Sequence, residues 1–117
     1  MDDDQMVRTA AARMLRSNGQ DVAVAADGEE AIRLYREAIA SHNGFDVVVL
    51  DLTVAGGMGG RECMEHLVRI DPNIKAIVSS GYSDDPIMSE FREYGFSDVV
   101  AKPYSLTELA EIVARLV

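Results

Sequence analysis

The sequence predicts a single α/β domain over residues 1–117, in which helices cover both faces of a doubly wound parallel sheet. Segments with apolar residues at helical spacing alternate with short apolar segments along the chain, which is typical of this fold class. The strand expected at 46–50 has four consecutive apolar residues, Val47 to Leu50, as expected for a strand covered by helices on both faces. Residues with a carboxylate, a hydroxyl and an ammonium group follow three of the expected strands.

Helices are expected at 4–18, 28–41, 63–70 and 86–94, and from 106 onward. The second, fourth and fifth are each preceded by a side chain that can cap a helix N-terminus: Asp27, Asp85 and Ser105. Glycine, which readily adopts the left-handed conformation that ends many helices, follows the first and fourth at Gly19 and Gly95. A turn at 71–73 ends the third helix.

Strands are expected at 21–26, 46–50, 74–79 and 99–100, so the element order begins with a helix. A parallel strand-helix-strand crossover requires a strand before its helix, and this strand should precede the helix at 4–18. Only Met1-Asp2-Asp3-Asp4 is available there. The first strand is therefore expected to be truncated or absent.

Composition favours a soluble globular domain, with 48% apolar and 26% charged residues. The chain has 11 basic and 20 acidic residues and a net charge of −9, which disfavours binding to nucleic acid or to anionic membranes. A lone cysteine, Cys63, allows no internal disulfide and is expected in the core. No segment approaches the ~20 apolar residues of a membrane span, and a cytoplasmic location is expected.

Asp51, Ser80 and Lys102 stand where three successive strands are expected to end. In parallel α/β sheets ligands bind at the carboxyl ends of strands, so these groups predict a site the size of a phosphoryl group. Taken singly, each has a structural explanation: Asp51 as a loop cap, Ser80 as a turn residue and Lys102 as a surface lysine. The acidic start at 2–4 could be a solvated terminus. The acidic start and the three groups at strand ends occur together in one chain, which favours a functional site over these separate structural explanations.

The chain resembles the receiver domain of two-component response regulators from Met1 to Val117. The resemblance rests on Asp2-Asp3, Asp51-Leu52-Thr53, Ser80-Gly81 and Lys102-Pro103. The stretches 51–60 and 78–86 particularly resemble receivers that are attached to hybrid sensor histidine kinases. The resemblance implies a flavodoxin-like sheet with strand order 2-1-3-4-5, in which the truncated strand would lie between 21–26 and 46–50.

By this resemblance Asp51 is the phosphoacceptor and Mg²⁺ the cofactor. Asp3 and Asp51 would ligate the ion directly, Asp2 mainly through water, and the backbone carbonyl of Thr53 would complete the protein ligands. Lys102 would pair with a phosphoryl oxygen and Ser80 would offer its hydroxyl. The resemblance also implies a cis Lys102–Pro103 peptide bond.

Some positions depart from the family pattern. Val99 stands three residues before Lys102, where receivers often have an aromatic residue that takes part in switching. Tyr82 or Tyr104 could take the role of that aromatic residue. The hydroxyl is a serine, Ser80, where threonine is commoner. Val54-Ala55 replaces a common Met-Pro pair in the glycine-rich loop.

Three classes of function follow. The first is a phosphoacceptor switch of a phosphorelay, whose partner is a histidine kinase or phosphotransfer protein and which is not itself an enzyme. The second is a receiver-like interaction module that is not phosphorylated. The third is a phosphatase like those of the haloacid dehalogenase family, but these have a second aspartate two residues after the first, where this chain has Thr53. Self-association through exposed sheet edges is a further expectation.

Overall fold

The computed structural model describes residues 1–82 and 84–117, with the backbone alone at residue 106. Ser83, inside the stretch 78–86 that resembles hybrid-kinase receivers, lies outside the described residues. The helices are α1 (Gln5–Ser17), α2 (Gly28–Ala40), α3 (Gly60–Ile70), α4 (Pro86–Ser89), the 3₁₀ helix η1 (Phe91–Tyr94) and α5 (Leu106–Leu116). The strands are β1 (Val48–Asp51), β2 (Ala76–Ser80) and β3 (Asp98–Ala101).

Local capping explains where the helices begin. Aspartate side chains accept backbone N–H bonds at the starts of α1, α2 and α4, and the Ser105 hydroxyl accepts the N–H of Glu108 at the start of α5. The glycines predicted to end helices have positive φ, 86° at Gly19 and 93° at Gly95. The predicted starts of α2, α4 and α5 are therefore confirmed.

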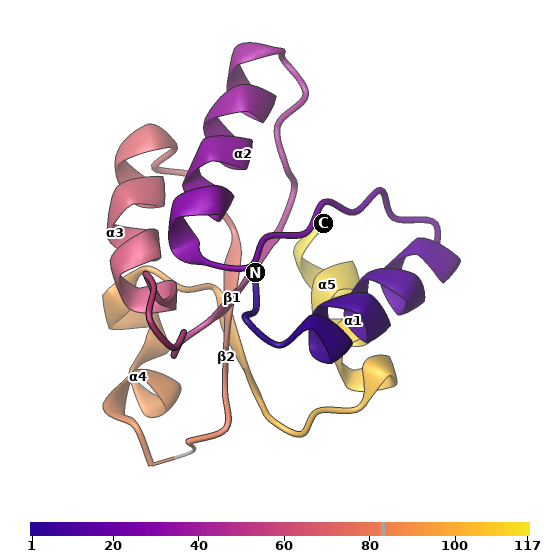
Figure 1. The fold of residues 1–117 in the computed structure, drawn as a ribbon, viewed down its shortest axis with the longest axis vertical. Coiled ribbons are helices and arrows are strands. Elements are labelled where there is room, and N and C mark those ends of the chain that lie inside the picture. Colours follow the sequence, from indigo (N-terminus) through magenta and orange to yellow (C-terminus); the bar gives the residue numbers. More distant parts are fainter. Residues whose placement is uncertain (83) are drawn as a thin grey trace.

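The described strands form a parallel sheet in the order β1-β2-β3, with Asp51 beside Ser79 and Ser80 beside Ala101. Helices α2 and α3 lie on one side of this sheet, and α1 and α5 lie on the other (Figure 1). Alternate residues of β2 enter the two cores: Val78 packs on the side of α2 and α3, and Ile77 on the side of α5. The predicted fold class, an α/β domain with a doubly wound parallel sheet, is confirmed.

The predicted strand at 21–26 is wrong, because residues 21–25 run without strand assignment. A strand needs a neighbour to hydrogen-bond, and the neighbour here consists of two residues. Asp2 donates its N–H to the carbonyl of Ala25 at 3.0 Å, and Asp51 donates to the carbonyl of Met1 at 3.0 Å. The truncated first strand is thus present only as Met1 and Asp2, and its expected position in the order 2-1-3-4-5 stays a prediction.

The continuous helix predicted for 86–94 is also wrong, since α4 ends at Ser89 and η1 follows it. The Ser89 hydroxyl donates to the Pro86 carbonyl at 3.2 Å. Such side-chain hydrogen bonds compete with the backbone hydrogen bonds of a helix. The Glu93 N–H then bonds to Glu90, three residues back, which gives the tighter helix. None of the described helices is long and apolar enough to cross a membrane.

Candidate functional site at the carboxyl edge of the sheet

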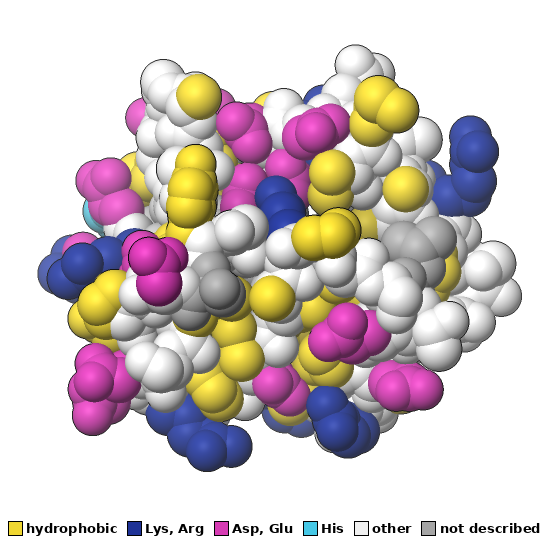
Figure 2. All heavy atoms as spheres, turned by 90° about the horizontal axis from the view of Figure 1, so that it is seen from below, with side chains coloured by type: hydrophobic (Ala, Val, Ile, Leu, Met, Phe, Trp, Pro, Cys, Tyr) yellow, Lys and Arg dark blue, Asp and Glu magenta, His cyan; other side chains and the backbone are white. Residues whose placement is uncertain are grey.

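The site lies at the edge where the strands end, and three carboxylates meet there. Each of Asp2, Asp3 and Asp51 offers an oxygen, and these oxygens lie within 4.8 Å of one another. Asp51 is the last residue of β1 and is 4% exposed, whereas Asp3 is exposed to solvent. Seen from below, acidic side chains gather around a basic side chain on this face (Figure 2).

Asp2 is held in place by hydrogen bonds from two other residues. Its side chain accepts the N–H of Asp4 at 2.9 Å, and its backbone carbonyl accepts from the Arg8 guanidinium at 2.7 Å. The resulting position is buried, with Asp2 6% exposed. The role of Arg8 was not predicted from the sequence, and its place one turn into a helix gives no signal of it.

Lys102, the residue after β3, contacts two of the three carboxylates. Its Nζ lies 2.7 Å from Asp2 Oδ2 and 3.2 Å from Asp51 Oδ1. Burial disfavours the ammonium, but the hydrogen bond with Asp2 and the charge of Asp51 outweigh it and raise the pKa of Lys102. The lysine is therefore a fixed positive charge between the carboxylates. The Lys102–Pro103 peptide bond is cis, as expected.

The carboxylates of the site differ in their affinity for protons. Burial, followed by the charge of Asp2, raises the pKa of Asp51 to about 6, with Lys102 opposing the shift. The N–H of Ala55 donates to the Asp3 carboxylate at 3.2 Å and lowers the pKa of Asp3. At neutral pH both groups are charged, and their mutual repulsion makes a cation favourable between them.

Within the described residues, neither Ser80 nor Thr53 forms a side-chain hydrogen bond with the acidic cluster. Ser80 ends β2 and is 1% exposed, and its hydroxyl oxygen accepts the N–H of Tyr82 at 3.0 Å. Thr53 lies in the exposed loop two residues after Asp51. The structure thus brings Asp2, Asp3, Asp51 and Lys102 together, and it places Ser80 on the strand next to β1.

The fold and the site define an α/β domain in which a half-buried lysine lies against an acidic cluster, consistent with a phosphoacceptor switch. Residues 1–114 match the response regulator receiver domain family, and the chain belongs to this family, whose members act in two-component signalling. The resemblance stated from the sequence is thereby confirmed.

Known proteins similar to this chain include both regulators and a kinase. Response regulator GacA of Pseudomonas aeruginosa is 31% identical over 118 residues, which are 99% of this chain and 52% of GacA. Sensor kinase CckA of Brucella abortus is 33% identical over 119 residues, 99% of this chain and 12% of CckA. The chain therefore spans about half or less of these relatives' length. The CheX–CheY–BeF3–Mg²⁺ complex of Borrelia burgdorferi is similar in fold, with a TM-score of 0.87, 24% identity, and coverage of 99% of this chain and 85% of that chain.

Proposed function

We propose that this receiver accepts a phosphoryl group on Asp51 from a histidine kinase or phosphotransfer protein, with Mg²⁺ as cofactor. The observation that carries the proposal is the meeting of three carboxylates with one lysine at the carboxyl edge of the sheet. A carboxylate nucleophile requires neutralisation of the charge on the transferring group, and this site offers a fixed ammonium and a cation-binding cluster.

The residues present fit a magnesium ion. Mg²⁺ prefers oxygen ligands and keeps several waters, so it needs few ligands from the protein. Asp3 and Asp51 would hold it directly and Asp2 mainly through water, with the Thr53 carbonyl as a further ligand. When bound, the ion supplies positive charge to the phosphoryl oxygens.

The chain's own residues supply the remaining chemistry. An oxygen of Asp51 forms the new bond to phosphorus as the bond from phosphorus to the donor's imidazole nitrogen breaks, and the imidazole keeps the electron pair and takes a proton from solvent. Lys102 pairs with a phosphoryl oxygen, a role for which its ammonium already lies 3.2 Å from Asp51. The Ser80 hydroxyl would turn from Tyr82 toward the phosphoryl group, so that the loop after β2 reports phosphorylation.

Intact-mass measurement tests this assignment. The chain, incubated with a small phosphodonor and Mg²⁺, should gain one phosphoryl group, and Asp51→Asn should gain none. Asp46→Asn is a matched control, because Asp46 is an exposed aspartate just before the same strand, and it should be labelled like the unaltered chain. Undiminished labelling of Asp51→Asn would show that another residue is the acceptor. Absence of any labelling would favour the interaction module that is not phosphorylated.

A further inference from the structure

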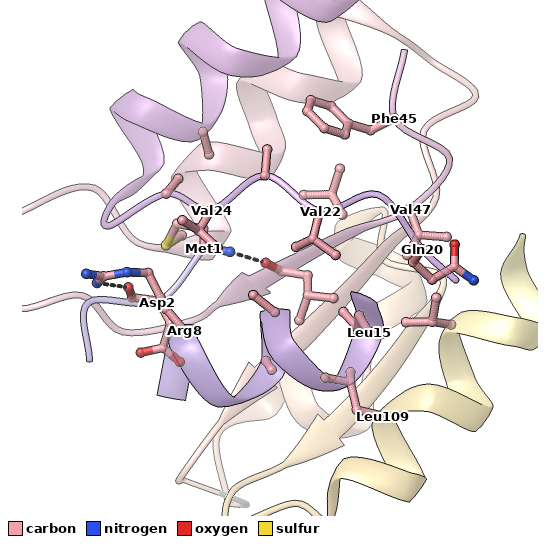
Figure 3. Close-up of a pocket in the computed structure, with 18 of the residues that line it drawn as sticks. Met1, Asp2, Arg8, Leu15, Gln20, Val22, Val24, Phe45, Val47 and Leu109 are labelled. Atoms are coloured by element: carbon pink, nitrogen blue, oxygen red, sulfur yellow. Dashed lines mark hydrogen bonds between the residues drawn. The ribbon is translucent and has the colours of Figure 1, made fainter. Parts of the chain in front are cut away.

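The Arg8 side chain reaches from α1 to the backbone between two carboxylates of the acidic cluster. Its Nη1 donates to the carbonyl oxygen of Asp2 at 2.7 Å, and Figure 3 shows the guanidinium beside Asp2 with this hydrogen bond as a dashed line. Arg8 is half-buried, and its guanidinium is positively charged. A hydrogen bond from a charged donor is about twice as strong as one between neutral groups, so this contact constrains the Asp2 carbonyl.

The Asp2 carbonyl lies where regular strand pairing stops. A residue in a parallel ladder bonds to two residues of its neighbour that are two positions apart. The Asp2 N–H bonds to the Ala25 carbonyl at 3.0 Å, so the next donor in a regular ladder would be the N–H of Asp27. Asp27 instead caps α2, and no backbone N–H among the described residues donates to the Asp2 carbonyl. Arg8 therefore supplies the hydrogen bond that a neighbouring strand would otherwise make.

The constrained carbonyl belongs to the peptide unit that joins Asp2 to Asp3. A peptide unit is planar, so a fixed carbonyl also fixes the direction in which the chain enters Asp3. Side chains of consecutive residues in an extended strand point to opposite faces, yet carboxylate oxygens of Asp2 and Asp3 lie within 4.8 Å of each other. The chain must turn at this peptide, and a bend is present at Asp3. Arg8 thus holds the peptide whose orientation brings the two carboxylates together.

The first turn of α1 determines where the arginine lies. Asp2 Oδ1 accepts the N–H of Asp4 at 2.9 Å, and Asp4 Oδ1 accepts the N–H of Met6 at 2.9 Å at the start of the helix. The N–H of Arg8 bonds to the Asp4 carbonyl at 3.0 Å, one helical turn earlier. The turn at Asp2 and the start of α1 therefore support one another through Arg8.

We propose that Arg8 is a positioning residue of the magnesium site, which holds the Asp2–Asp3 peptide so that both carboxylates face one ion. The inference rests on the proposed function, because it concerns the same site. A guanidinium has no acceptor for a metal, so Arg8 acts only through the aspartates that it orients. Replacement of residues that orient metal ligands typically weakens metal binding by about 10–100-fold.

The charge of Arg8 by itself would have the opposite effect on the metal. A positive charge near the acidic cluster repels Mg²⁺, so removal of a purely electrostatic arginine would tighten metal binding. Removal of a positioning arginine weakens binding, because the two carboxylates lose their common orientation. The sign of the change in Mg²⁺ affinity therefore separates the two roles.

Calorimetric titration of the full chain with Mg²⁺ tests the proposal. Arg8→Met removes the donor and the charge and should raise the Kd for Mg²⁺ at least about tenfold. Arg8→Lys should stay within about threefold of the unaltered chain, since a single nitrogen makes the contact and an ammonium can replace it. Arg13→Met is the matched control, because Arg13 is an exposed arginine on the same helix and its replacement removes the same charge. Its Kd should not rise.

A second readout distinguishes positioning from a general loss of stability. The amide chemical shift of Asp3 reports on the peptide that Arg8 holds, so it should change in Arg8→Met and return in Arg8→Lys. All titrations are made well below the Tm on chains that are folded by circular dichroism. Arg8→Gln loses the charge and has a shorter side chain, and it should raise the Kd at least about threefold. It replaces Arg8→Met if that variant does not fold.

The outcomes separate this inference from the proposed function. Mg²⁺ binding by the unaltered chain, with equal or tighter binding by the folded Arg8 variants, would overturn the positioning role and leave the phosphoacceptor proposal intact. Failure of Arg8→Lys to restore the affinity that Arg8→Met loses would also overturn it. An unaltered chain that binds no Mg²⁺ would overturn the proposed function and this inference with it.

Discussion

Gly60, the first residue of α3, lies against the backbone of the proposed phosphoacceptor. A Cβ added there would lie 2.8 Å from the Asp51 carbonyl oxygen and 3.2 Å from Leu50 Cβ. Ordinary van der Waals contact begins at 3.4 Å, so the shortfall at the oxygen is 3.4 − 2.8 = 0.6 Å. The contacted atom belongs to the backbone of β1 and cannot turn away as a flexible side chain would. Gly60→Ala must therefore displace either α3 or Asp51.

The expected cost follows from two opposed effects. Overpacking of this kind destabilises proteins by about 1–3 kcal/mol, and alanine regains up to about 1 kcal/mol over glycine in a helix. A net loss of about 1–2 kcal/mol should lower the Tm by roughly 5–10 °C in a chain of this size. Displacement of Asp51 by a few tenths of an ångström should also slow phosphoryl transfer by about three- to tenfold.

Thermal melts and labelling rates of two variants decide the matter. Gly44→Ala is the control, because its added Cβ would meet only Ile39 Cδ1 at 3.4 Å, an ordinary contact. We expect Gly44→Ala to melt within about 2 °C of the unaltered chain and to be labelled at the same rate. A Gly60→Ala chain that matches this control in both measurements would refute the steric reasoning.

Two further predictions follow from side-chain contacts. Lys102→Met should tighten Mg²⁺ binding severalfold in a metal titration, because the ammonium, at 2.7 and 3.2 Å from two carboxylates, competes with the cation. Lys75 is exposed, and Lys75→Met should have no effect. Weaker Mg²⁺ binding in Lys102→Met would contradict this prediction. Tyr35→Phe removes the 2.8 Å hydrogen bond to Asp71 and should lower the free energy of unfolding, measured by urea denaturation, by about 1–2 kcal/mol. An unchanged free energy would mean that hydrogen bonds to water in the unfolded chain are as favourable as this one.

The sequence alone determined the features that depend on neighbouring residues. Asp27, Asp85 and Ser105 were predicted to precede helices, and each side chain accepts a helix N–H in the structure. A cap depends on a side chain and the next few amides, so local sequence suffices to predict it. The apolar run before Asp51 placed that residue correctly at a strand end, because a strand buried on both faces must be apolar throughout.

The acidic site was predictable in its members but not in its contacts. Strand ends in a parallel sheet share one edge, so the order of Asp51, Ser80 and Lys102 predicted a common site. The ion pairs of Lys102 with Asp2 and Asp51, and the pKa of about 6 at Asp51, depend on burial and on distances between residues remote in sequence. Such quantities arise only when the chain is packed.

Tertiary structure alone decided that residues 21–25 do not form a strand. Their valines at alternate positions, Val22 and Val24, favour a strand. A strand exists only where a neighbour completes its hydrogen bonds, and in the part of the chain that the structure describes the one such bond is from Asp2 to Ala25. A cavity lies between residues 20–25 and residues 45–49, and the Met1 ammonium donates to the Val49 carbonyl at its end. Propensity is a property of a segment, whereas strand pairing is a property of two segments brought together by the fold.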